Sequence, residues 1–244
     1  DFKARISGYY TRIYDQSKVI SYYDDVAATF TNFAMSGIDK VHFGLEAAVS
    51  IPIYHTLALN GAVSWGQYTY DSNPYYLQTQ DNSGDIVSDG YVYWKDFRVE
   101  STPQTAVNVG LSWRSNNNIY LSADFNYYNN MYLSMSPIYR TDAVITGGMA
   151  PGDIEHLRRQ EKFDSAYTLN ASIGKNWYIH RKYTLGFSLD VKNILNNQDI
   201  KTGGYEQTRL SKNTETTVTT YQAFDSKYFY MFGTTYYLNL YFRF

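Results

Sequence analysis

Apolar and polar residues alternate along most of this 244-residue chain, with the two-residue period of a β-strand that buries one face. The C-terminal segment shows the pattern most clearly. Its apolar positions are Leu238, Leu240, Phe242 and Phe244, and the positions between them are Asn239, Tyr241 and Arg243. The same alternation recurs in earlier segments such as 107–114, 119–126 and 185–192, and no segment has a convincing helical period. The pattern therefore predicts an all-β protein.

The alternation predicts eight strands. They span about 2–14, 38–51, 55–70, 103–115, 118–133, 164–178, 182–196 and 227–244. The stretch at about 18–35 has two interpretations, a ninth strand or the arm of an extracellular hairpin. Several strands run to about 13–17 residues, longer than the roughly 9–11 residues that a barrel strand needs to cross a bilayer. We therefore expect the strands to extend beyond the membrane.

The connections between the predicted strands fall into two classes of length. Tight turns are predicted at 52–54, 115–117 and 179–181. Long loops, rich in Gly, Asn, Asp, Ser and Thr, are predicted at 71–102, 134–163 and 197–226. Outer-membrane β-barrels have short turns on the periplasmic side and long loops on the extracellular side. The loop lengths therefore favour an antiparallel transmembrane β-barrel over a soluble sandwich.

Composition limits the function classes. Cysteine is absent, which excludes a cysteine nucleophile, a disulfide and a cysteine-ligated metal. The net charge is −2 and basic residues form no run, so no nucleic-acid partner is predicted. No stretch of about 18 apolar residues exists, and no transmembrane helix is predicted. A mean hydropathy of −0.44 still permits a transmembrane barrel, because only one face of each strand has to be apolar.

Aromatic residues make up 18% of the chain, including 27 tyrosines, and many lie near the predicted strand ends. Such residues form girdles at the two membrane–water interfaces of outer-membrane barrels. The alternative is that tyrosine simply suits strands. The clusters are Trp65, Tyr68 and Tyr70; Tyr127, Tyr128 and Tyr132; Trp177 and Tyr178; and Tyr228, Phe229 and Tyr230. Their position at both ends of the apolar segments favours girdles.

The C-terminal third resembles a family of membrane proteins. Residues 187–197 read FSLDVKNILNN and residues 202–209 read TGGYEQTR. Both resemble the penultimate strand and last extracellular loop of TonB-dependent outer-membrane receptors, in the version found in Bacteroidetes. Residues 227–244, KYFYMFGTTYYLNLYFRF, resemble the closing strand of these receptors, whose terminal aromatic residue is read by the barrel-assembly machinery. The resemblance is specific over about 160–244 and only architectural over 1–159.

The resemblance implies a roughly 22-stranded barrel that is filled by an N-terminal plug. Residues 1–244 then correspond to the C-terminal portion of that barrel, about 8–10 strands, without the plug and the N-terminal strands. The sequence has no export leader and starts directly with a strand pattern. An unpaired strand edge in hydrocarbon would leave its backbone groups without hydrogen bonds. We therefore expect residues 1–14 to pair with a preceding strand and not with residues 227–244.

The resemblance also implies a function, partners and a location. The expected function is TonB-dependent import of a nutrient (a glycan, a peptide or an iron chelate) across the bacterial outer membrane. The expected partners are outer-membrane lipid, the N-terminal strands and plug of the same receptor, TonB through the plug region and, as in some relatives, a surface lipoprotein. The alternatives are a passive porin and a non-transport barrel such as an adhesin.

Enzyme, metal and cofactor sites find little support. His42, His55, His156 and His180 are dispersed over one strand, two turns and a loop. Asp153, Glu155 and His156 are close enough in sequence to hold a divalent ion, but a solvated loop is the simpler interpretation. Asp81, Ser83 and Asp85 have the spacing that opens a calcium loop, yet Val92 stands where such a loop needs Glu. No catalytic residue, metal or cofactor is predicted.

Two sets of residues remain as candidates for contact with a ligand or a plug. The predicted lumen-facing set is Lys3, Arg5, Glu46, Asn60, Arg114, Asp124, Asn126, Asn170, Asp190, Lys192 and Arg243. Its simplest role is to solvate the lumen and to dock a plug, because these groups would be costly to bury in hydrocarbon. The predicted substrate-binding set is Tyr75, Tyr76, Tyr91, Tyr93 and Trp94, whose rings could stack on a sugar or an aromatic ligand. Ordinary packing of the loop is the alternative for this second set.

Overall fold

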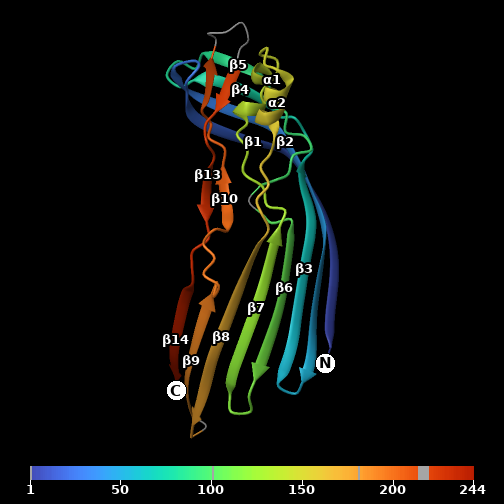
Figure 1. The fold of residues 1–244 in the computed structure, drawn as a ribbon, viewed down its shortest axis with the longest axis vertical. Coiled ribbons are helices and arrows are strands. Elements are labelled where there is room, and N and C mark those ends of the chain that lie inside the picture. Colours follow the sequence, from blue (N-terminus) through green and yellow to red (C-terminus); the bar gives the residue numbers. More distant parts are fainter. Residues whose placement is uncertain (1, 101, 181, 214–219) are drawn as a thin grey trace.

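A computed structural model describes residues 2–100, 102–180, 182–213 and 220–244. The described chain is all-β, with one ten-stranded antiparallel sheet and two small two-stranded sheets (Figure 1). Eight long strands form most of the large sheet. They are β1 (Lys3–Asp24), β2 (Thr29–Tyr54), β3 (Leu57–Tyr70), β6 (Thr105–Arg114), β7 (Ile119–Asn129), β8 (Ala166–Ile179), β9 (Tyr183–Lys192) and β14 (Thr235–Arg243). Each of the eight predicted strands corresponds to one of them.

The long strands lie side by side in chain order, and every neighbouring pair is antiparallel. In Figure 1 their lower parts form one tilted sheet, with both chain ends at the bottom. Among the described residues, β1 pairs only with β2, and β14 pairs only with β9. The two outer strands of the sheet, β1 and β14, are therefore not hydrogen-bonded to each other, and the described part of the chain does not form a closed barrel. The expected pairing of residues 1–14 with a preceding strand remains a prediction.

The stretch at 18–35 is not a ninth strand. It forms both arms of a hairpin, because β1 continues to Asp24 and β2 begins at Thr29. Two register irregularities mark where this hairpin leaves the lower sheet, at 13–16 and 16–18 on β1. Asp15 (φ 52°) and Gly37 (φ 73°) adopt left-handed backbone conformations there. The extra residue near Gly37 shifts the alternation of β2, so that Met35 and Ile38 are both buried.

The predicted long loops contain secondary structure. Residues 71–102 include β4 (Tyr75–Gln80) and β5 (Ile86–Tyr91), which pair beside the upper part of β2. This upper part of the ten-stranded sheet is here called the small upper sheet. Residues 134–163 include the 3₁₀ helix η1 (Ile138–Arg140) and the helices α1 (Asp142–Ile145) and α2 (Pro151–Arg158). Residues 197–226 include β10 (Lys201–Tyr205), β11 (Leu210–Asn213) and β12 (Thr220–Ala223). None of the helices in the described parts of the chain has the length and apolar character to span a bilayer.

The predicted final strand, 227–244, is divided in two by a bend. β13 (Lys227–Tyr230) pairs with β10, and β14 begins only at Thr235. Asn193 causes the division, because its Nδ2 donates to the carbonyl of Phe232 at 3.0 Å and its own carbonyl accepts from Thr234 Oγ1 at 2.8 Å. These bonds hold residues 231–234 against the end of β9 and out of the ladder.

The tight turns lie close to their predicted positions. The prediction at 52–54 is wrong by a few residues, because β2 continues through Pro52 to Tyr54 and the turn is formed by His55 and Thr56. Pro52 opposes Ala58, next to a register shift at the end of the ladder, where a residue without an N–H is tolerated. The turn at 115–117 is confirmed, and the third turn lies between Ile179 and Tyr183, with residue 181 outside the described part.

Tyrosine rings cover glycines on the polar face of the large sheet. Tyr120 lies over its cross-strand partner Gly174, and Tyr241 lies over its partner Gly186. A Cβ atom at either glycine would overlap the ring. Tyr9 lies in the same way between Gly44 and Gly66, where a Cβ would be 2.5 Å and 2.6 Å from its hydroxyl oxygen. Glycine is therefore needed at these positions, because a larger residue would occupy the space of the tyrosine ring. The ring in turn supplies the side-chain packing that glycine lacks.

We predict that Gly174→Ala destabilises the protein by about 1–3 kcal/mol, because the new methyl group must displace the Tyr120 ring in a tightly packed site. The free energy of unfolding in urea measures the effect. In the Tyr120→Ala background the same substitution should cost much less. Gly203→Ala is the control, because its Cβ would meet Phe229 at an ordinary 3.6 Å. Equal stability of Gly174→Ala and the parent protein would contradict the proposed overlap.

Candidate functional site

Strand register gathers the apolar residues onto one face of the large sheet. Directly opposed residues of antiparallel strands point to the same face. One such row crosses seven strands: Ile51, Leu59, Leu111, Ala123, Ala171, Val191 and Tyr236. A second row crosses six strands: Ile6, Ala47, Val63, Val107, Tyr127 and Tyr167. The apolar faces of the individual strands are therefore joined into one continuous surface, here called the apolar face.

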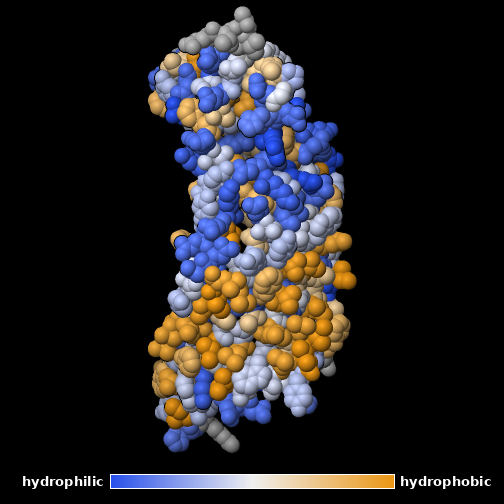
Figure 2. Space-filling model, in the orientation of Figure 1, coloured by the Kyte–Doolittle hydropathy of each residue, from blue (hydrophilic) through white to orange (hydrophobic). Residues whose placement is uncertain are grey.

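The apolar face is open. Leu238 is 60% exposed, Leu240 71% and Leu45 57%. In Figure 2 apolar residues gather over the lower part of the molecule, whereas the upper part is mostly hydrophilic. Isolated exposed apolar residues are normal on a soluble protein, but a continuous apolar surface marks a site of contact with a partner or a membrane. The face is therefore the first candidate functional surface.

The opposite face of the same strands, here called the polar face, carries hydrogen-bonded polar side chains. Asn60 accepts from Ser50 at 2.8 Å and donates to Ser112 at 3.3 Å. Asn126 accepts from Asn108 at 2.8 Å and donates to Thr168 at 3.3 Å. These bonds run across the strands, as expected for polar neighbours on one face. Asn60 and Asn126 belong to the predicted lumen-facing set, whose members on these strands share this face.

The predicted aromatic girdle residues separate between the two faces. Trp65 (47% exposed), Trp177 (41%) and the half-buried Tyr127 lie on the apolar face. Tyr68 lies on the polar face, where its hydroxyl is 2.5 Å from that of Tyr9. Tyr70 is buried beneath the long loops. Only the first group is therefore positioned to meet the surroundings of the apolar face.

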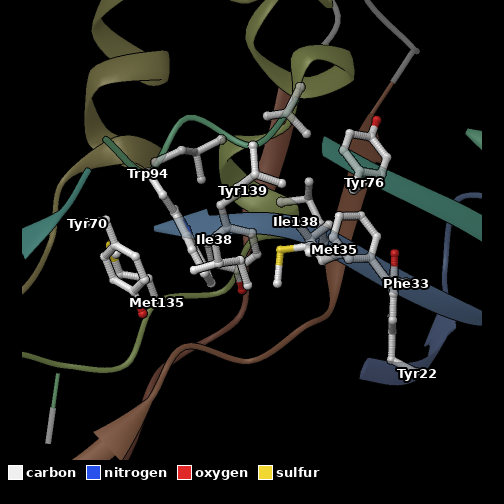
Figure 3. Close-up of a cluster of buried hydrophobic side chains, with 14 of the residues drawn as sticks. Tyr22, Phe33, Met35, Ile38, Tyr70, Tyr76, Trp94, Met135, Ile138 and Tyr139 are labelled. Carbon is white, nitrogen blue, oxygen red and sulfur yellow. The ribbon is translucent and has the colours of Figure 1, made fainter. Parts of the chain in front are cut away.

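The three long loops and the β1–β2 hairpin pack together around a cluster of buried hydrophobic side chains, here called the loop core (Figure 3). Phe33 of β2 stacks on Tyr76 of β4 with ring centroids 4.6 Å apart. Tyr70 packs against Trp94 at 4.7 Å. Further buried members are Tyr22, Met35, Ile38, Val92, Met135, Ile138, Tyr139, Val144, Met149, Leu157 and Leu210. The three loops and the hairpin thus form one packed unit above the sheet, here called the loop unit.

The predicted substrate-binding aromatics fall on both sides of the small upper sheet. Tyr76 and Trp94 are 1% exposed and belong to the loop core. Tyr75 (41% exposed) and Tyr91 (53%) lie on the outer side as an edge-to-face pair with centroids 5.6 Å apart. Tyr93 is half-buried, with the guanidinium of Arg158 5.7 Å from its ring centroid. The five residues therefore do not converge on one site, and ligand contact by them remains a prediction.

A buried ion pair joins two of the long loops. Arg140 of η1 is fully buried and its Nη atoms donate to both carboxylate oxygens of Glu206, at 2.5 Å and 2.9 Å. Arg140 also donates to the carbonyls of Ser136 at 2.9 Å and Arg159 at 3.2 Å, and the Ser136 N–H donates to Glu206 at 2.7 Å. Burial and the nearby Glu206 carboxylate raise the pKa of Tyr139 to about 12. This part of the loop unit is therefore rigidly cross-linked.

Two further ion pairs connect the loop of residues 197–226 to its surroundings. Arg209 donates two hydrogen bonds, at 3.0 Å and 2.9 Å, to Asp25 at the tip of the β1–β2 hairpin. These bonds hold the pKa of Asp25 below its usual value. Lys201 bonds Glu161 at 2.9 Å and lies 3.8 Å from the ring centroid of Tyr228. The loop is thus tied both to the hairpin and to the residues that follow α2.

The loop unit contains a partly open cavity of about 260 Å³, here called the loop cavity. It lies between the β1–β2 tip, β4 and β5, α1, and β11 with β12. Phe33, Tyr76, Ile138, Val144 and Leu210 supply buried apolar walls. The sequence did not indicate this site, because its residues come from segments far apart in the chain and form no motif.

The candidate metal positions are not brought together. Among the described residues, no group of three or more His, Asp or Glu side chains has the geometry to hold a metal ion. Asp153, Glu155 and His156 are solvent-exposed as expected, but the expected loop is wrong, because these residues lie in α2, which starts with Pro151 at its first turn. Asp81 accepts a hydrogen bond from Asn32 at 2.7 Å, which occupies it within the small upper sheet. His42 packs on Tyr68, with ring centroids 4.8 Å apart.

Comparison of the sequence with models of protein families gave no match, and comparison with curated proteins gave no match either. These comparisons therefore assign the chain to no family, and the resemblance to TonB-dependent receptors remains a hypothesis.

We predict that Arg140→Met destabilises the loop unit by about 3–5 kcal/mol, because Glu206 would be left as a buried charge without its partner. Hydrogen exchange of the backbone amides in 133–160 measures the effect. The matched control is Arg12→Met, which removes the exposed pair with Asp71, whose side chains are 41% and 32% exposed. The control should cost at most about 1 kcal/mol. Equal effects of the two substitutions would show that the buried pair has no special role.

Proposed function

We propose that this chain forms part of a transmembrane β-barrel in the bacterial outer membrane, and that the barrel belongs to a TonB-dependent receptor that imports a nutrient. The observation that carries the proposal is the continuous apolar face, which lies opposite a polar, hydrogen-bonded face of the same strands. Lipid on one side and a wet lumen or a plug on the other would satisfy both faces. The proposal makes outer-membrane lipid the first partner of the chain.

The exposure of the apolar face favours lipid over a second protein layer within the chain. A soluble sheet of this kind would cover its apolar face with helices or another sheet. The two α-helices of the described chain lie instead in the loop unit at the upper end of the molecule (Figure 1). The hydrocarbon of a bilayer would cover the face without any further protein.

The two open sheet edges favour a larger barrel. In hydrocarbon, the backbone groups along β1 and β14 need partners, and closure of the sheet provides them. We propose that further strands of the same receptor join β1 to β14 in a roughly 22-stranded barrel. The polar face would then meet a plug domain, through which TonB would supply energy from the periplasm.

The packed loop unit favours a selective receptor over a passive porin. Its loops share one core and are cross-linked by the buried Arg140–Glu206 pair, so they present a fixed surface at one end of the strands. A fixed surface that contains a pocket suits the recognition of a particular ligand. The nutrient and a surface lipoprotein partner are proposed only at the level of the family resemblance.

We predict that Leu240→Arg lowers the stability of the inserted barrel by about 2–4 kcal/mol, because it places a charge on the lipid side of the sheet. Asn239→Arg is the matched control, since its neighbouring position on β14 faces the polar side. The fraction of heat-modifiable, folded protein in outer-membrane preparations measures both. Similar losses for the two variants would mean that the apolar face does not contact lipid.

We predict that Asn82, in the exposed turn between β4 and β5, faces the cell exterior, and that Asn117, in the exposed turn between β6 and β7, faces the periplasm. The chain has no cysteine, so Asn82→Cys and Asn117→Cys each introduce a single thiol. A membrane-impermeant thiol reagent should label only the first on intact cells and both after lysis. Labelling of Asn117→Cys alone on intact cells would reverse the proposed orientation.

A further inference from the structure

The loop cavity has the size and lining of a small-molecule site. Its volume is about 260 Å³, and an apolar cavity of roughly 150 Å³ is already large enough to bind benzene. The stacked rings of Phe33 and Tyr76 form one wall, and Ile138, Val144 and Leu210 contribute others. A bulky apolar group could thus be removed from water here without rearrangement of the loop core.

A buried amide gives the cavity a fixed polar position. Gln78 is 5% exposed, and its Nε2 donates to Asp24 at 2.6 Å, to the Tyr22 hydroxyl at 3.0 Å and to Thr31 at 3.3 Å. The Asp24 carboxylate also accepts the backbone N–H groups of Val26 and Ala27, at 2.8 Å and 3.0 Å. The amide and the carboxylate are therefore held in place before any ligand arrives.

The charges around the cavity are balanced. Asp25 is neutralised by its two hydrogen bonds from Arg209, which leaves the Asp24 carboxylate and the Lys212 ammonium among the lining residues. Lys212 is exposed, and its Nζ lies 5.9 Å from the ring centroid of Tyr221, which also lines the cavity. One anionic and one cationic group beside apolar walls match a ligand that carries both charges.

This lining discriminates among nutrient classes. The hydroxyl groups of a glycan would lose their hydrogen bonds to water against the aliphatic walls of Ile138, Val144 and Leu210. An anionic iron chelate would find no net positive charge, since the charged lining residues are Asp24, Asp25 and Lys212, and the nearby Arg209 is bonded to Asp25. A short peptide supplies the required combination: an apolar side chain, an α-carboxylate and an α-ammonium group.

We propose that the loop cavity binds a short peptide, with a bulky apolar side chain against Phe33, Tyr76 and Val144 and with the peptide carboxylate near Lys212. The proposal rests on the proposed receptor function and narrows its nutrient to peptides. Lys212 then determines affinity for the charged end of the peptide, and the apolar walls determine which side chain is accepted.

The dipeptide Ala-Phe is a direct probe, with Gly-Gly and maltose as comparison ligands. Equilibrium binding is measured by calorimetry on the complete receptor in detergent. Ala143 lines the cavity from an exposed position on α1, so Ala143→Trp should fill the cavity and weaken Ala-Phe binding at least tenfold. Ala150→Trp is the matched control, because Ala150 is also exposed but does not line the cavity. It should bind as the parent protein does.

A second variant tests the charged contact without touching the loop core. Lys212→Gln should weaken binding of Ala-Phe several-fold and leave binding of the C-terminal amide Ala-Phe-NH₂ nearly unchanged. Absence of Ala-Phe binding to the parent receptor would overturn the proposal, as would equal binding by Ala143→Trp or stronger binding of maltose than of Ala-Phe.

The outcome can be separated from that of the proposed function. A heat-modifiable receptor in the outer membrane that binds no Ala-Phe would overturn the peptide site and leave the barrel proposal standing. A chain that never enters the outer membrane would overturn the barrel proposal, while the calorimetry would still decide whether the cavity binds Ala-Phe.

Discussion

The structure depends on the register of its long strands. Because side chains alternate between faces, a slip of one residue would exchange the faces of a whole strand. The observed register instead aligns apolar residues in rows that cross up to seven strands. The polar ladders through Asn60 and Asn126, and the tyrosine rings over Gly174 and Gly186, are formed by the same alignment. Each of these features forms only in the observed strand pairing, so together they specify the register of the sheet.

The loop unit depends on the sheet in turn. β1 and β2 continue past the lower sheet, and the irregularities near Asp15 and Gly37 change the direction in which their side chains point. Phe33, Met35 and Ile38 can therefore form the base of the loop core, to which the three long loops contribute the remaining walls. The cavity proposed to bind a peptide lies in this core, and its position relative to the lower part of the large sheet is fixed by the two continuous strands β1 and β2.

The two-residue alternation was sufficient to predict the all-β class, the eight long strands and the two faces, because one face of each strand is uniformly apolar. It could not predict the hairpin at 18–35, where bulges interrupt the period, or the bend at 231–234, which depends on the side chain of the distant Asn193. The sequence identified candidate ligand-binding aromatic residues, but it could not predict which of them are buried. These residues are Tyr75, Tyr76, Tyr91, Tyr93 and Trp94. Neighbouring strand residues alternate in direction, so Tyr75 is exposed and Tyr76 is buried. The loop cavity could not be predicted, since only tertiary contacts assemble it.

The contact between Arg209 and Asp25 spans 184 positions of the chain. Contacts of such long sequence separation are costly in chain entropy and form late, after the local pairing of strands has shortened the effective loop. The hairpin tip must therefore remain without its partner until the C-terminal third has been synthesised and aligned. During that interval the apolar side of the hairpin, including Tyr22 and Phe33, is uncovered and prone to aggregation. A chaperone that holds the chain until its last strands are in place would protect this segment above all.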